Sequence, residues 1–245
     1  MQTIKGDGNI VTQSIDITDY DNLSVEGGTI AVDYTQTDTP SSLQIKTDQN
    51  IFEKYEFKME ENVLKIRPKK EFRYRTNFNP TEFVVTTNSR TLKKFSGAGN
   101  VTFNANSPMQ GEKFEAEMAG SGAIQLNDSA IFTKLKVEIA GSGEFKGMKI
   151  NAGEMDGDIA GSNTFNLGGN IGKAVFSIAG SGRVYAFDCT IDHLECEIAG
   201  SGDITATVTT SIKAEIAGSG TVKYKGNPQN IQKDVMGSGD IEKVD

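Results

Sequence analysis

The pentapeptide Ile-Ala-Gly-Ser-Gly occurs four times without change, beginning at residues 139, 178, 198 and 216. Related motifs extend the series in both directions, and their first glycines are 18 to 23 residues apart. A period near 20 residues that persists this long is the signature of a repeat architecture, so it constrains the fold more than any other feature. The first glycines are Gly97, Gly120, Gly141, Gly161, Gly180, Gly200, Gly218 and Gly237.

Apolar and polar residues alternate before each motif, as in LKVEI (135–139) and IKAEI (212–216). A shorter alternation follows each glycine pair. Period two is typical of strands with one buried face, and no helical spacing separates these strands, which excludes an α/β solenoid. Coils made only of strands stack at about 4.8 Å and enclose an apolar column. The sequence therefore predicts an all-β fold, a right-handed parallel β-helix with coils of about 20 residues.

The third motif position is glycine in every repeat except one, where Asn163 replaces it. Asparagine is the residue other than glycine that best tolerates a positive φ, so we expect a left-handed backbone at this position. Because each residue should lie over its counterpart one coil away, we also expect Gly143, Asn163 and Gly182 to form one vertical file.

Residues 1–95 are less regular than residues 96–245, and we expect irregular N-terminal coils within a single elongated domain that spans 1–245. The chain has only five prolines, which argues against a disordered linker protein. Two stretches, 22–34 and 55–66, fit either a β-hairpin or a wider solenoid corner. In the last coil, Lys233 falls on an otherwise apolar column and Met236 replaces the motif alanine, which indicates capping.

The charge balance limits the classes of partner. The net charge is −8, and residues 96–245 carry 12 Lys and Arg against 19 Asp and Glu. Nucleic acid is excluded as a partner because phosphate binding needs a basic face. The glycine motifs lack the lysine and the helix of a phosphate-binding loop, and calcium-binding repeats need a nine-residue period with aspartate in each unit. No cofactor and no metal site are predicted.

The location of the protein is only partly constrained by local features. No run of 18 apolar residues exists, so no transmembrane helix is predicted. Met1 is followed by polar residues, and no secretory signal is expected within these residues. The two cysteines, Cys189 and Cys196, fit either core thiols or a single disulfide, and they leave the redox compartment open.

Two groups of residues are candidates for a binding surface. The stretch 65–80 sets basic residues among aromatic ones and is either a surface for an anionic glycan or a solvated cap of the solenoid. Three aromatics of the later repeats should point outward, although ordinary surface packing explains them as well. The candidates are Phe72, Arg73, Tyr74 and Arg75 in the first group, and Tyr185, Phe187 and Tyr224 in the second.

A row of carboxylates raises the alternative of an enzyme that cleaves polysaccharides. Glycoside cleavage needs carboxylates in individual environments, whereas these residues should share one solvated face. The lone His193 is expected to be a surface residue. No catalytic residues are therefore predicted, and the enzyme stays an alternative, as does a purely structural envelope protein. The row consists of Glu138, Asp158, Glu197, Glu215 and Asp234.

Residues 5–245 resemble the head GIN domain family of autotransporter adhesins. The resemblance rests on GDGNI (6–10), YDNLSVEGGTIAVDYTQ (20–36), SLQIKTDQNI (42–51) leading to NVLKI (62–66), and the serial glycine motifs, which occur in the same order. It implies a β-solenoid, a location in the bacterial cell envelope and an adhesive role, with no catalytic residues to transfer. It also fits a lipid anchor on an N-terminal segment that has been removed.

The repeat and the resemblance together lead to one functional expectation. The protein should be a non-catalytic binding or adhesion module of the cell surface or periplasm, which presents a rigid solenoid face to a glycan or a protein. Because the coil at an open end has an unpaired edge, we expect a monomer or a weak homodimer.

Overall fold

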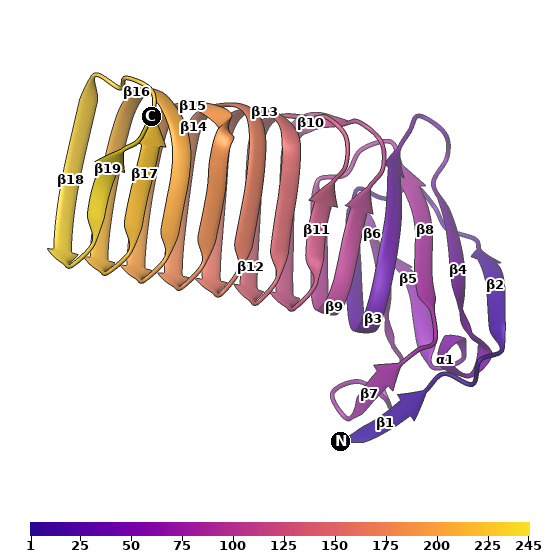
Figure 1. The fold of residues 1–245 in the computed structure, drawn as a ribbon. Coiled ribbons are helices and arrows are strands. Elements are labelled where there is room, and N and C mark those ends of the chain that lie inside the picture. Colours follow the sequence, from indigo (N-terminus) through magenta and orange to yellow (C-terminus); the bar gives the residue numbers. More distant parts are fainter.

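The computed structural model describes all residues from Met1 to Asp245, and nearly all of them form β-structure. From β9 onward the strands stack in parallel register to form a β-solenoid of about eight coils (Figure 1). The fold class predicted from the repeat is confirmed. These strands are β9 (Lys94–Ala105), β10 (Met109–Gly120), β11 (Ala123–Leu126), β12 (Ala130–Gly141), β13 (Glu144–Gly161), β14 (Thr164–Gly180), β15 (Arg183–Gly200), β16 (Asp203–Gly218), β17 (Thr221–Lys225), β18 (Asn230–Gly237) and β19 (Asp240–Lys243).

The N-terminal part is less regular, as expected, because parallel and antiparallel strand pairings are mixed in it. Strand β3 pairs in parallel with β9 on one side and with β6 and β8 on the other, while β2, β4 and β8 are joined by antiparallel pairings. A layer of mixed pairing thus covers one end of the solenoid. Its elements are β1 (Gln2–Lys5), β2 (Ile10–Ile15), β3 (Asn22–Gln36), β4 (Ser42–Asp48), α1 (Gln49–Phe52), β5 (Tyr55–Glu60), β6 (Val63–Pro68), β7 (Thr76–Asn79) and β8 (Phe83–Ser89).

The structure resolves the two stretches that the sequence left open. Strand β3 continues through residues 22–34 as a solenoid corner, where Gly27 and Gly28 have φ of 89° and 69° and shift the register against β9. Strands β5 and β6 instead form an antiparallel hairpin, with Glu61 in the turn at φ 54°. The corner needs glycine because few other residues adopt a positive φ without strain.

The interior is filled by columns of apolar side chains, one from each coil. One column contains Phe103, Ile124, Phe145 and Phe165, which are all fully buried. Side chains in neighbouring coils differ in size where one of them needs space. Gly157 lies in register with Phe176 of the next coil, and a Cβ on Gly157 would lie only 2.7 Å from that ring. The buried apolar side chains form one cluster of 57 residues. Removal of this surface from water is the main favourable contribution to folding.

The last coil carries exposed side chains at two positions that the sequence indicated as capping. Lys233 lies in register with the buried Ala214 but is exposed, and Met236 is 69% exposed in the position of the motif alanine.

Both cysteines are buried free thiols, so the alternative of a disulfide is wrong. Burial raises the pKa of the Cys189 thiol to about 12, which makes it a poor nucleophile.

The expectation of a left-handed third motif position is wrong. A positive φ occurs instead at the first glycine of each motif, from 110° at Gly99 to 136° at Gly120. The register also shows that Gly99, not Gly97, is the first glycine of the earliest motif. The third position needs glycine for space: a Cβ on Gly202 would lie 2.7 Å from Ile178 Cγ2 and 2.8 Å from the Gly182 carbonyl oxygen.

Asn163 is the one residue with a side chain at the third position, and its amide forms hydrogen bonds with the backbone of the preceding coil. The expected file is confirmed, since Thr164 and Arg183 donate backbone hydrogen bonds to the carbonyls of Gly143 and Asn163. The buried Asn163 amide accepts from the Gly143 N–H at 2.7 Å and donates to the Ile139 carbonyl at 2.8 Å. The side chain therefore links two coils from the inside.

We predict that Gly200→Ala lowers the free energy of unfolding by about 3 kcal/mol. The backbone at Gly200 has φ 128°, and a Cβ there would lie 2.3 Å from the Gly180 carbonyl oxygen, so two coils would have to separate. Urea denaturation measures the change. The control is Ala199→Ser, at the exposed neighbouring position, which should change stability by less than about 0.5 kcal/mol. Equal midpoints for the two variants would contradict the role assigned to this glycine.

We predict that Asn163→Leu costs about 3 kcal/mol of stability, because a side chain of similar size leaves a buried N–H and a buried carbonyl without partners. Thermal and urea unfolding measure the loss. Asn166→Leu, at a partly exposed position of β14 three residues later, is the matched control and should stay close to the wild-type value. A stable Asn163→Leu protein would show that these hydrogen bonds contribute little.

Candidate functional site

A shallow groove of about 590 Å³ runs across the outer surface of β9, β10, β12, β13, β14 and β15. It follows from the repeat itself. In Ile-Ala-Gly the isoleucine points inward, so the alanine points outward, and the glycine beside it has no side chain. The column of outward alanines, with their small side chains, therefore leaves a trough along the solenoid axis. Its exposed floor consists of Ala119, Ala140, Ala160, Ala179 and Ala199.

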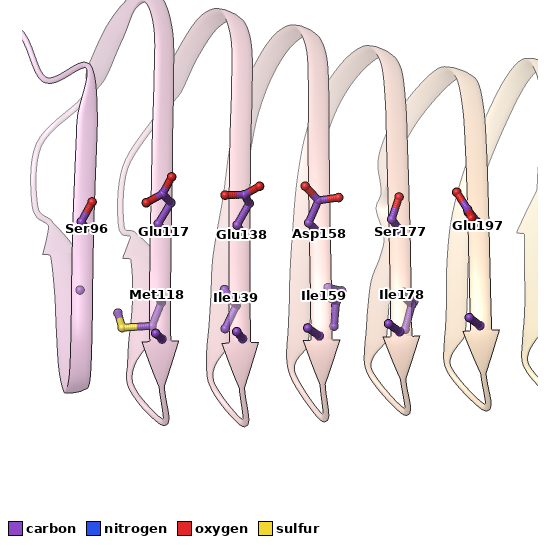
Figure 2. A pocket seen from close by; sticks show the side chains of 16 residues that line it. Ser96, Glu117, Met118, Glu138, Ile139, Asp158, Ile159, Ser177, Ile178 and Glu197 are labelled. Carbon is purple, nitrogen blue, oxygen red and sulfur yellow. The ribbon is translucent and has the colours of Figure 1, made fainter.

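Carboxylates line one side of the groove (Figure 2). They come from the outward residue two positions before each alanine, and the parallel register places them one coil apart, at about 4.8 Å. In Figure 2 the near strands run downward and successive coils advance to the right, which is the right-handed sense. The full column is Ser96, Glu117, Glu138, Asp158, Ser177, Glu197, Glu215 and Asp234.

The carboxylates differ in their partners. Glu117 forms an ion pair with Lys94 at 2.9 Å, and Glu138 forms one with Lys136 at 3.2 Å. These contacts raise the pKa of both lysines. Asp158 is different: burial, together with the neighbouring Glu138 carboxylate, raises the pKa of Asp158 above its ordinary value. The groove is therefore acidic, and Asp158 at its centre is the carboxylate that resists ionisation.

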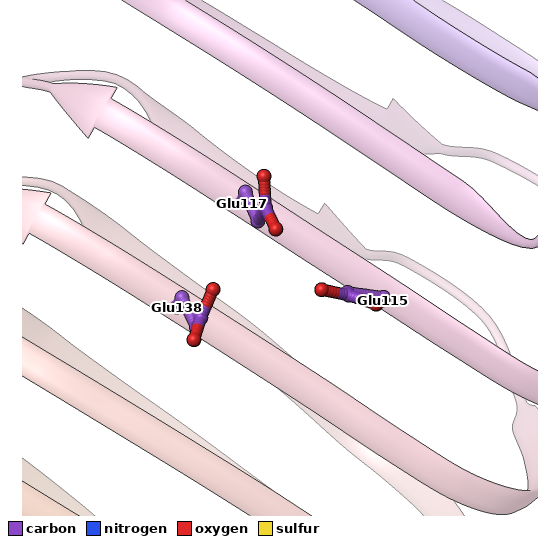
Figure 3. Close-up of side chains that lie close together, drawn as sticks. All are labelled: Glu115, Glu117 and Glu138. Carbon is purple, nitrogen blue, oxygen red and sulfur yellow. The ribbon is translucent and has the colours of Figure 1, made fainter.

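Three carboxylates, those of Glu115, Glu117 and Glu138, bring oxygen atoms within 4.8 Å of one another (Figure 3). Each has a lysine partner within ion-pairing distance, Lys113 for Glu115 at 3.5 Å being the third. These lysines already supply the positive charge that a bound cation would bring. The arrangement is that of a surface ion-pair network.

The sequence-predicted candidates lie in two places far apart on the solenoid, and neither group lines the groove. Residues 72–75 precede β7 at the N-terminal end (Figure 1). Tyr185 and Phe187 both belong to β15, and Tyr224 belongs to β17. Tyr185 is 43% exposed, and the ring of Phe187 lies 4.9 Å from Lys225 Nζ. The expectation that Tyr224 points outward is wrong, because it is only 9% exposed, lies in register with the buried Ala206 and shares the inner face of β17 with Val222.

Within residues 72–75 the side chains have different environments. Phe72 packs edge-on against the buried Phe78, and Arg73 forms an ion pair with Glu56 at 2.9 Å. Tyr74 is 86% exposed and Arg75 is exposed. His193 is an exposed residue, as expected, and its Nδ1 lies 2.8 Å from Ser211 Oγ.

The alanine floor and Glu117 were missed by the sequence interpretation, although the signal was present. The motif reads acidic, apolar, alanine in most repeats. Since the acidic residue points outward and the next residue inward, alternation alone places the alanine outward beside the acid.

The fold and its acidic lateral groove define a β-solenoid with a repeated surface rather than a single enclosed pocket. The chain belongs to the family described as "Putative auto-transporter adhesin, head GIN domain", whose model matches residues 19–131 and 117–228. The resemblance seen in the sequence is thereby confirmed.

Solved structures show the same fold over the whole chain. A "Putative lipid binding protein" from Parabacteroides distasonis is 35% identical, with a TM-score of 0.95 and 100% of both chains covered. A "putative adhesin" from the same species is 29% identical, with a TM-score of 0.91 over 99% of this chain and 100% of that one. Another "putative adhesin", from Parabacteroides merdae, is 29% identical, with a TM-score of 0.86 and both chains fully covered. No curated protein matches the chain.

No helix of the structure has the length and apolar character needed to cross a bilayer. The single helix, α1, has four residues.

We predict that Asp158→Asn stabilises the protein near neutral pH. Between the ordinary aspartate pKa of 3.8 and the raised pKa of the folded state, the folded protein holds the proton more tightly than the unfolded chain. Stability is therefore lost as pH rises through this range, and the amide removes the loss. Urea denaturation should show a gain near neutral pH that disappears below pH 3.8.

The matched control is Glu215→Gln in the same column, where the side chain is 55% exposed. It should shift stability by less than about 0.5 kcal/mol at either pH. A gain for Asp158→Asn that persists in acid would contradict the assignment of the effect to ionisation.

Proposed function

We propose that the protein is a non-catalytic binding module of the bacterial cell envelope, which uses the acidic groove to hold an extended ligand along the solenoid axis. The observation that carries the proposal is the groove of about 590 Å³, with its alanine floor and its row of carboxylates. Solenoids commonly bind through such extended lateral surfaces. The family description and the relatives described as adhesins support an exported or cell-surface location.

The chemistry of the groove favours a glycan or protein segment that carries amino or other cationic groups, because two of its four carboxylates, Asp158 and Glu197, have no ion-pair partner within the protein. A flat apolar floor accepts the face of a sugar ring or a small side chain, and carboxylates spaced one coil apart accept hydrogen bonds from successive groups along the ligand. A strongly anionic polymer would be repelled, because the groove contains four carboxylates.

A hydrolase is a less satisfactory explanation of the same carboxylates. General acid and base catalysis needs two groups whose environments separate their roles. Asp158 has a raised pKa, as a general acid would need. Of its two neighbours in the column, however, Glu138 is held by a lysine at 3.2 Å and the other is Ser177, so no second free carboxylate lies beside it. The test of the enzyme alternative is depolymerase activity that disappears in Glu197→Gln.

We predict that Ala160→Trp abolishes ligand binding while the fold is retained. Ala160 is exposed at the middle of the floor, and an indole there fills the groove. The measurement is binding of the labelled protein to an array of neutral, acidic and amino-sugar oligosaccharides together with basic and acidic peptides. Wild type should bind the amine-bearing members, and Ala160→Trp should bind them at least about tenfold more weakly.

Lys146→Trp is the control, because Lys146 is an exposed residue of β13 that does not line the groove. It should bind like wild type. The proposal fails if no member of the array is bound at millimolar concentration, or if both tryptophan variants lose binding equally.

A further inference from the structure

Residues 69–75, which connect β6 to β7, form a second exposed feature at the N-terminal end of the molecule, and none of them lines the groove. Strand β7 pairs in parallel with β1 in a separate two-stranded sheet. Figure 1 shows this sheet projecting from the solenoid at its N-terminal end. We call residues 69–75 the basic loop, because they contain Lys69, Lys70, Arg73 and Arg75 against the single acidic residue Glu71.

The base of the basic loop is firmly held. The backbone N–H groups of Phe72 and Arg73 donate to the Lys69 carbonyl at 2.9 and 3.2 Å, which closes a turn. The Phe72 ring packs on Phe78, with Lys54 Nζ 4.9 Å from the Phe72 centroid. Arg73 donates to the Pro68 carbonyl and to Glu56. Phe72 and Arg73 are thus structural residues, and they fix the direction of the rest of the loop.

The remaining side chains have no partner within the protein. Lys69, Lys70 and Arg75 take part in no ion pair, whereas the neighbouring Lys65, Arg67 and Arg73 are all paired with Glu56 or Glu60. Tyr74 is 86% exposed at φ 65°, a left-handed conformation that is unfavourable for a tyrosine. The chain therefore holds an aromatic ring in water, between cations, at a cost in backbone energy.

The charge of the basic loop contrasts with that of the rest of the molecule. The net charge of the protein is −8, and the acidic groove lies on the regular coils. An anionic surface would repel that groove and attract the basic loop, so approach through the N-terminal end is favoured over approach through the lateral face. An open hollow of about 630 Å³, lined by Glu71, Tyr74 and Arg75 among others, leaves room beside the ring.

We propose that the basic loop docks on the surface of a bilayer that contains anionic phospholipids. Lysine and arginine side chains near such a surface contribute to binding individually. A tyrosine ring is suited to the boundary between headgroups and acyl chains, since its body is apolar and its hydroxyl is polar. A ring that projects from a braced turn between unpaired cations fits a broad anionic surface, because the ring and the charges can contact it together.

The absence of tryptophan from the sequence allows a direct test. Tyr74→Trp introduces a single fluorescent probe at the tip of the loop, and Tyr185→Trp, at a 43% exposed position of β15, is the matched control. The lipid probes are vesicles of phosphatidylcholine alone and vesicles of equal parts phosphatidylcholine and phosphatidylglycerol. Emission of Tyr74→Trp should shift to shorter wavelength and be quenched by brominated acyl chains only with the anionic vesicles, and added salt should reverse the effect. Tyr185→Trp should not respond.

Co-sedimentation with the same vesicles measures the contribution of the cations. Lys70→Gln combined with Arg75→Gln should weaken binding about 25-fold, about fivefold for each residue, while Lys146→Gln combined with Lys149→Gln, two exposed lysines of β13, should leave it unchanged. The proposal is overturned if the protein does not bind anionic vesicles, if Tyr185→Trp responds equally, or if the loop variant binds like wild type. Binding of soluble polygalacturonate instead of vesicles would also overturn it, in favour of an anionic glycan.

Discussion

The structure depends on the backbone hydrogen bonds that join each coil to the next in unshifted register around the motif. From Gly99 to Gly237 every first glycine pairs with its counterpart, and the backbone after it donates to the coil before. A close approach of this kind leaves no space for a Cβ at the corner. The same register carries every outward residue into a column, so a feature of one coil becomes a feature of the whole surface.

The groove is the direct result of this register. The outward alanine of each motif has a small side chain, and its repetition from coil to coil produces a continuous trough beside the carboxylates. Relatives that share the fold over the whole chain include proteins described as adhesins and one described as a lipid binding protein. The groove and the basic loop provide two surfaces of opposite charge, which are suited to different partners.

The regular coils could be predicted from the sequence because each residue there has a local rule. Alternation identified the buried columns, and the acidic row followed from the same parity, with Glu117 and the alanine floor as omissions. The left-handed position was assigned to the wrong glycine, because Asn163 occupies its place through side-chain hydrogen bonds rather than through a positive φ. The N-terminal layer could not be predicted, since β3 lies between β9 and strands that follow it in sequence, β6 and β8. The outward direction of Tyr224 failed for a simpler reason: alternation placed it with Val222, on the buried face.

Equivalent corners have a consequence for how such molecules change in size. Because the Gly161 corner meets Gly141 and Gly180 in nearly the same way, a whole coil is a unit that can be removed or duplicated while its neighbours join directly. Each such event alters the reach of the molecule by one strand spacing and adds or removes one carboxylate position. Length in this architecture is a whole number of turns, so a change in the number of coils would alter how far the tip extends without redesigning either end.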